Sequence, residues 1–187
     1  MGKDGNPAQI NHLKVSVTAE GRPTRRRKMH LAEPDASGSG LMAMLLTGTF
    51  FRTLDDKKRL GLPKRVRDQL ENPEAVSVTP GPDQSLWLYS QPALERLAEK
   101  LDQAPATDAG ARVFRRLFFA QIETVDLDGN GRILIPERLL EFAGLKHEVV
   151  LIGVRDHLEL WDAERWQQYM AQNAPRFDAV AEGAFQK

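Results

Sequence analysis

The stretch DLDGNGRILIPE, residues 126–137, carries oxygen-bearing side chains at a spacing that could bind a cation. Asp126, Asp128 and Asn130 alternate, Gly131 stands at position six, and Glu137 closes the twelve-residue frame. In the calcium loop of an EF-hand, carboxylate and carbonyl oxygens in this frame coordinate the ion, with glycine at the sharp turn. The spacing alone therefore raises a calcium site as one hypothesis.

A second copy of the stretch argues against calcium. Residues 53–70 align with 126–143 at an offset of 73, and the match continues downstream at an offset of 72. In the first copy Lys57 and Lys58 fall at positions five and six, and Lys64 replaces the closing carboxylate. An ammonium group cannot coordinate a divalent cation. Residues 122–127 also have a strand pattern where an EF-hand needs a helix, so we expect no metal site.

Both copies share Asp-x-x-x-Arg followed by apolar-x-apolar-Pro-x-Arg. This pattern predicts a turn between two strands, with Asp55 beside Arg59 in one copy and Asp128 beside Arg132 in the other. A carboxylate that accepts from an arginine holds the planar guanidinium in one orientation. The free edge could then bind guanine O6 and N7, or a phosphate. The alternative is a surface ion pair that only stabilises the turn and contributes little; the repetition favours function.

Each repeat predicts the same series of elements. A strand (50–54 or 122–127) leads through the turn into a second short strand, and a proline opens a short helix. Two further strands follow (75–79 with 85–89, and 148–153 with 157–161), and Ser90 or Asp162 caps a closing helix. Residues 109–119 form a helix between the repeats. Since one repeat is too short to bury a good core, we expect the two to pack together.

Composition excludes several function classes. The chain of 187 residues has no cysteine, which removes disulfides, thiolate metal sites and cysteine nucleophiles. Its four histidines show no metal-ligand spacing, Ser90 suits a helix cap better than a nucleophile, and no glycine-rich phosphate loop occurs. We therefore expect no enzyme and no cofactor. A formal net charge of zero means that any nucleic-acid binding must depend on local charge.

Residues 1–43 differ from the rest because Gly, Pro, Ser and charged residues dominate there. We expect a disordered N-terminal extension, whose basic cluster GRPTRRRK (21–28) either is simply solvated or contacts phosphates non-specifically. The absence of a long apolar run and of a signal-peptide core predicts a cytoplasmic protein without a membrane span. The expected organisation is completed by a first unit (44–103), a connecting helix (104–119), a second unit (120–172) and a C-terminal tail (173–187).

From about residue 44 to 169 the chain resembles the MraZ family of bacterial transcriptional regulators, within the AbrB/SpoVT-like swapped-hairpin superfamily. The resemblance rests on LDDKKRLGLPKRVRDQL and LDGNGRILIPERLLEFAGL, and on VVLIGVRDHLELWDAERW (149–166) as the closing segment. It implies an α+β fold, in which two tandem AbrB-like swapped-hairpin units intertwine into one β-barrel-like domain with short flanking helices. It also implies a homo-oligomeric ring, associated with the nucleoid, that binds double-stranded DNA at upstream direct repeats.

By position, the resemblance assigns DNA binding to the two turns. The candidate residues are Asp55, Lys57, Lys58, Arg59, Asp128, Asn130 and Arg132. We expect the arginines to read bases and the lysines to hold the DNA backbone. The family usually has glycine at the place of Lys58, which leaves the conformation of the first turn open. The alternative function is an oligomeric AbrB-like interaction module, antitoxin-like, without specific DNA readout.

Overall fold

The computed structural model describes residues 45–71, 73–105 and 107–185. The predicted N-terminal extension, including its basic cluster at 21–28, lies outside the described residues. Among the helices of the described part, none is long and apolar enough to cross a membrane.

The elements confirm the predicted series in both repeats. In chain order they are β1 (Leu46–Thr53), β2 (Arg59–Gly61), α1 (Lys64–Gln69), β3 (Ala75–Pro80), the 3-10 turn η2 (Pro82–Gln84), β4 (Leu86–Tyr89), α2 (Gln91–Asp102), α3 (Ala109–Phe119), β5 (Glu123–Asp126), β6 (Arg132–Leu134), α4 (Glu137–Ala143), β7 (Glu148–Arg155), β8 (His157–Asp162), α5 (Ala163–Asn173), the 3-10 turn η3 (Ala174–Arg176) and α6 (Phe177–Phe185). The predicted α+β class is confirmed. The segment expected to be a plain tail contains η3 and α6 instead.

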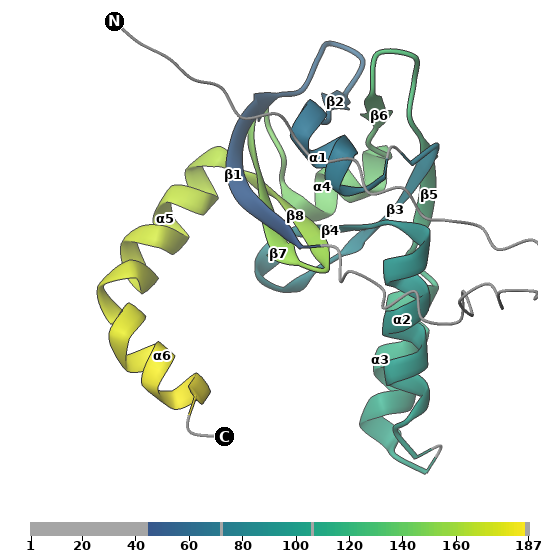
Figure 1. Ribbon diagram of the computed structural model, residues 1–187, viewed down its shortest axis with the longest axis vertical. Helices are drawn as coiled ribbons and strands as arrows, with labels where there is room; N and C mark the ends of the chain where they lie inside the picture. The colour runs from purple at the N-terminus through teal and green to yellow at the C-terminus, as the bar shows by residue number, and fades with distance from the viewer. Residues whose placement is uncertain (1–44, 72, 106, 186–187) are drawn as a thin grey trace, which may run out of the picture. The chain divides into compact units, whose positions relative to one another are not determined.

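Strands of both repeats contribute to one antiparallel sheet with the order β1-β7-β8-β4-β3-β5 (Figure 1). Strand β1 of the first repeat pairs with β7 of the second, and β5 of the second pairs with β3 of the first. The short strands β2 and β6 form a separate antiparallel ribbon. Among the described residues β1 and β5 each pair on one side only, so the sheet is open. The closed barrel-like arrangement expected from the family resemblance is therefore wrong for the described part of the chain.

The strand register reveals an internal two-fold relationship. Leu60 faces Ile133 in the β2–β6 ribbon, and these residues are each other's counterparts in the repeat. At the centre of the sheet, Trp87 faces its own counterpart, Glu159. An antiparallel pair in which equivalent residues face each other has a two-fold axis at that point. The two repeats are therefore related by local two-fold pseudosymmetry, which brings their turns to the same end of the unit.

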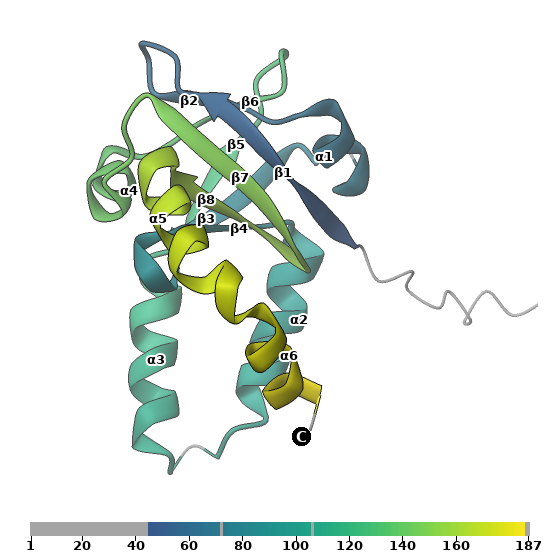
Figure 2. The same ribbon diagram turned by 90° about the vertical axis from the view of Figure 1, so that its left-hand side faces the viewer.

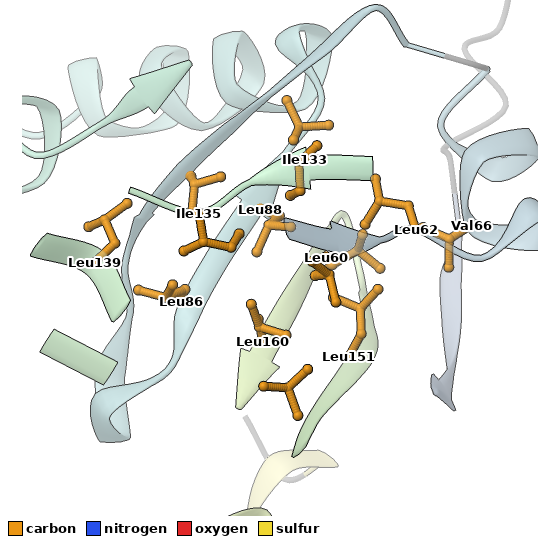
Figure 3. Packing of buried hydrophobic residues seen from close by; sticks show 14 of the residues in the cluster. Leu60, Leu62, Val66, Leu86, Leu88, Ile133, Ile135, Leu139, Leu151 and Leu160 are labelled. Carbon is orange, nitrogen blue, oxygen red and sulfur yellow. The ribbon is translucent and has the colours of Figure 1, made fainter. Parts of the chain in front are cut away.

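The main hydrophobic core contains residues of both repeats, as expected for units too short to fold alone. Side chains with at most 5% exposure come from the segment β2 to α1 and from β4 of one repeat, and from the segment β6 to α4 and from β7 and β8 of the other (Figure 3). They include Leu60, Leu62, Val66, Leu86, Leu88, Ile133, Ile135, Leu139, Leu151 and Leu160. Burying this much apolar surface is the dominant stabilising contribution to a fold. Leu60 and Ile133 are both fully buried, so they anchor the β2–β6 ribbon, which carries the turns, in the core.

Helix ends agree with the sequence patterns in part. Asp162 caps α5 through its side chain, which accepts from the backbone N–H groups of Glu164 and Arg165, and Gly144 ends α4 in the left-handed conformation. Ser90 occupies the predicted N-cap position of α2, but its side chain makes no capping hydrogen bond. Pro63 and Pro136 occupy the cap position just before α1 and α4, one residue earlier than expected.

Candidate nucleic-acid interface

Asp55 organises the first turn through both of its carboxylate oxygens. Oδ1 accepts from the backbone N–H groups of Lys57 and Arg59, each at 2.9 Å, which closes the turn. Oδ2 accepts from Nε and Nη2 of Arg59, each at 2.8 Å. The second turn repeats this pattern: Oδ1 of Asp128 accepts from the backbone of Asn130 and Arg132, and Oδ2 accepts from the Arg132 guanidinium. The predicted pairing of aspartate with arginine is confirmed in both repeats.

The two turns also share a backbone conformation. Lys58 has φ of 59° and Gly131, its counterpart, has φ of 70°. This left-handed region suits glycine and costs other residues energy because Cβ approaches the carbonyl oxygen. Both residues donate their backbone N–H to the carbonyl of the aspartate three positions earlier, at 2.8 Å. The glycine-to-lysine difference therefore leaves the first turn's shape intact and places strain at Lys58.

The arginines and aspartates form one network across the repeats. Nη1 of Arg59 lies 3.8 Å from Oδ2 of Asp128, and Nη1 of Arg132 lies 3.7 Å from Oδ2 of Asp55. Each aspartate thus contacts both arginines, closely its own and more distantly the other. The four side chains are about one-third exposed. In a partly solvated ring of alternating charge each charge is held by two neighbours, so the network fixes the turns relative to each other better than one surface ion pair could.

The network lowers the pKa of both carboxyl groups. Hydrogen bonds from the side chain and then the backbone of Arg132 lower the pKa of Asp128 to about 2. The backbone N–H of Arg59, opposed by burial and assisted by the Arg59 side chain, lowers the pKa of Asp55. Hydrogen bonds that stabilise the charged form of an acid have this direction of effect. Both groups are therefore ionised at neutral pH, and the network as a whole is neutral.

The ion pairs limit which guanidinium nitrogens of Arg59 and Arg132 can bind a ligand. The guanidinium edge formed by Nε and Nη2 is occupied by the arginine's own aspartate. The remaining donors are on the Nη1 and Nη2 end, the part of each fork still able to reach a base edge or a phosphate. Lys57, Lys58 and Asn130 are exposed at the turn tips. Figure 1 shows both turns together at one end of the unit, away from α2 and α3. The seven candidate residues are thus brought into one surface.

Arg67 follows the first turn in the sequence but lies beside the second turn in the structure. Its guanidinium packs against Gly131. The backbone N–H of Leu62 donates to the carbonyl of Gly131 at 3.0 Å, which brings the start of α1 beside that turn. The exchange of strands between repeats is the physical reason. No local sequence signal indicates it, because the pattern of α1 is the same whichever turn it approaches.

The residues that match the calcium-loop spacing do not have the secondary structure of an EF-hand. Residues 126–137 run from the end of β5 through the turn and β6 to the first residue of α4, and the strand predicted before the frame is confirmed. Asp128, at position three of the frame, holds Arg132. Within the described ranges no group of three or more His, Asp or Glu side chains could hold a metal ion.

In comparison with known proteins, each of the two repeats matches a family model by itself. The sequence model of the family described as "MraZ protein, putative antitoxin-like" matches twice, at residues 45–117 and 118–187. The chain is 40% identical over 138 residues to the transcriptional regulator MraZ of Heliobacterium modesticaldum, covering 74% of this chain and 95% of that protein. It is 36% identical over 134 residues to that of Finegoldia magna, covering 72% and 92%. Two matches in tandem and this degree of identity establish that the chain belongs to the MraZ family.

Proposed function

We propose that this protein is a transcriptional regulator that binds specific double-stranded DNA through its paired turns. The observation that carries the proposal is the network of Asp55, Arg59, Asp128 and Arg132, which holds two cation-bearing turns side by side on one surface. The names of the relatives, transcriptional regulators, support the regulatory role. Association with the nucleoid is part of this proposal.

The roles within the surface follow from the geometry of each donor. The free end of each guanidinium presents two nitrogens in one plane, which matches O6 and N7 of guanine in the major groove. Lys57 and Lys58 are mobile point charges at the tip and suit phosphate oxygens, which position a protein without specifying sequence. Asn130 offers both a donor and an acceptor at the tip of the second turn. Asp55 and Asp128 orient the arginines.

We propose further that the chain forms a homo-oligomeric ring. Three side chains on one face of α3, Val113, Phe114 and Leu117, are 46–59% exposed, and on α6 Phe177 and Val180 are 71% and 56% exposed. Figure 1 places α3 and α6 on different sides of the unit. Exposed apolar surface at two different places favours head-to-tail association, which closes into a ring when the rotation allows. A ring would present several pairs of turns to direct repeats upstream of a gene.

The reciprocal pairing of β1 with β7 and of β5 with β3 supports a swapped-hairpin description of the two units. In this description each repeat completes the other's sheet, and the turns between β1 and β2 and between β5 and β6 are the DNA-facing hairpin tips. The assignment is ours and rests on the family resemblance together with this strand exchange.

A competition experiment tests the proposal. Fluorescent DNA from upstream of the protein's own gene is titrated with the full chain and then competed with unlabelled upstream or scrambled DNA. We expect upstream DNA to compete at much lower concentration. Equal competition by both, or no binding to either, would favour the alternative of an antitoxin-like interaction module, a reading that the family description also accommodates.

A further inference from the structure

The two turns differ in charge although their backbones match. The tip of the first turn consists of Asp56, Lys57 and Lys58, whereas the tip of the second consists of Gly129, Asn130 and Gly131 and has no cation of its own. At the left-handed position the difference is sharpest, because Lys58 stands opposite Gly131 in the repeat. If both tips contact an anionic polymer, a cation from another part of the chain must take the place of the lysines that the second tip lacks.

Arg67 places its guanidinium where a side chain of residue 131 would be. A β-carbon built on Gly131 would lie 2.6 Å from Nη1 of Arg67 and 2.7 Å from its Cζ. The space that the Lys58 side chain enters in the first turn is therefore filled, in the second, by the arginine of α1. Gly131 is buried as a result. Glycine is required there both by its φ of 70° and by the close approach of Arg67.

The helix position equivalent to Arg67 carries a cation only where the tip of the neighbouring turn has none. The counterpart of Arg67 in the second repeat is Leu140, which is 9% exposed and belongs to the core. The start of α4 lies beside the first turn, since Ile135 donates to the carbonyl of Lys58 at 3.2 Å. At the equivalent helix position the first turn thus receives an apolar residue, and it carries its own cation. The second turn receives an arginine, and its tip carries no cation.

Arg67 also has unused donors. Its Nε is buried without a hydrogen-bond partner, and among the described residues no carboxylate forms an ion pair with it. A hollow of about 230 Å³ beside it is lined by Arg67, Pro73, Glu74, Leu127, Asp128 and Gly131. Asp128 is neutralised by Arg132, and Glu74 is exposed to solvent. A guanidinium that lines a hollow and has no carboxylate partner in the described part of the chain favours a ligand that supplies acceptor oxygens.

We propose that Arg67 binds a DNA backbone phosphate beside the second turn, the role that Lys58 has beside the first. The inference rests on the proposed function and deepens it, because it assigns a phosphate contact to a residue outside both Asp-x-x-x-Arg turns. It also makes each DNA-facing turn a product of both repeats, with the turn from one and the cation from the other. Arginine suits this task because its several donors can engage a phosphate in a fixed geometry.

The first test measures binding to upstream and scrambled DNA across a salt series. We expect Arg67→Gln to weaken binding to both DNAs by a similar factor and to reduce the slope of log K against log salt by about one. Lys100→Gln is the matched control, since it removes one positive charge from an exposed position in the last turn of α2. Figure 2 shows α2 on the side of the unit away from the turns. Lys100→Gln should leave the slope unchanged.

A second variant separates a phosphate contact from support of the turn. The pair Arg67→Ala with Gly131→Lys moves the cation into the turn, as in the first repeat, and should restore the slope that Arg67→Ala alone loses. If Arg67 only supports the turn, Arg67→Gln lowers the melting temperature and the preference for upstream DNA while the slope stays at the wild-type value. That result overturns the inference and leaves the proposed function standing. A wild-type chain that binds no DNA overturns both.

Discussion

Nη1 of Arg59 lies 3.8 Å from Oδ2 of Asp128, a carboxylate that belongs to the other repeat. Its mirror contact, Arg132 to Asp55, is 3.7 Å long. Motifs 73 residues apart in the chain thus share their charges, so a change in one turn should affect the other. Residues in one ion-pair network generally show non-additive effects.

The aspartates are the sharpest test of orientation. Asp55→Asn or Asp128→Asn removes a negative charge from the DNA-facing surface, which by itself raises attraction to any DNA. Because the arginine loses its charged partner, we expect binding to upstream DNA to weaken while binding to scrambled DNA stays equal or strengthens. Competition titrations of each variant measure both. Stronger binding to the two DNAs in parallel would contradict an orienting role.

The arginines should contribute to sequence preference. If each fork contacts a guanine, Arg59→Ala or Arg132→Ala costs about 1–3 kcal/mol per contact and relaxes the preference at one base pair. In a ring that engages several repeats the total loss is larger, because every linked contact is affected. Lys57→Ala is the comparison: it should weaken all sequences alike and reduce the salt slope by about one. Arginine variants that lose upstream and scrambled binding equally would mean that the turns only clamp phosphates.

Strain at Lys58 predicts a stabilising substitution. Lys58→Gly relieves a left-handed conformation worth roughly 1–2 kcal/mol, offset by roughly 0.5–1 kcal/mol from the greater freedom of glycine in the unfolded chain. We expect a net gain on the order of 0.5–1 kcal/mol in thermal or denaturant unfolding, with a shallower salt slope in DNA binding. Gly131→Ala is the opposite case and should destabilise, because its β-carbon would meet Arg67. Loss of stability in Lys58→Gly would contradict this account.

Asp128 predicts a specific pH dependence of stability. A carboxyl whose pKa is lowered on folding stabilises the folded state fully above its unfolded pKa, near 3.8, and this stabilisation is lost as the pH falls toward the folded pKa of about 2. Wild type should therefore lose more stability than Asp128→Asn between pH 5 and 2. Urea unfolding of both proteins across this range provides the measurement. Parallel curves would indicate that the network does not persist in solution.

Self-association should depend on the exposed face of α3. Sedimentation of the wild-type chain at micromolar concentration should give a species well above the 21.0 kDa of one chain. Leu117→Glu places a charge on a residue that is 59% exposed, so it should lower the sedimenting mass without affecting the fold. Lys100→Glu, a charge change on exposed α2 surface, is the control. A monomeric wild type would exclude the ring.

The order and type of the elements were accessible from the sequence because they depend on local patterns. Alternating apolar residues predicted β2 and β6, prolines marked the starts of α1 and α4, and residues 109–119 formed the helix expected between the repeats. The pairing of each aspartate with its own arginine also followed from the four-residue spacing, which spans one turn. Domain boundaries, the seven DNA-facing residues and the ring remain predictions.

Only the tertiary structure shows which strands of one repeat pair with strands of the other. Both repeats carry the same apolar pattern, so pairing of β1 within its own repeat or with β7 of the other satisfies the sequence equally well; the combined core selects the exchange. With this pairing β1 and β5 are the edges of the sheet, and Arg59 lies near Asp128. Arg67 lies beside the second turn, although it follows the first turn in the sequence. Ser90 is a local example of what the sequence pattern does not determine. Its side chain is buried by packing and makes no capping hydrogen bond. Contacts between distant segments depend on how the whole core closes, and a single sequence does not encode them in any local spacing.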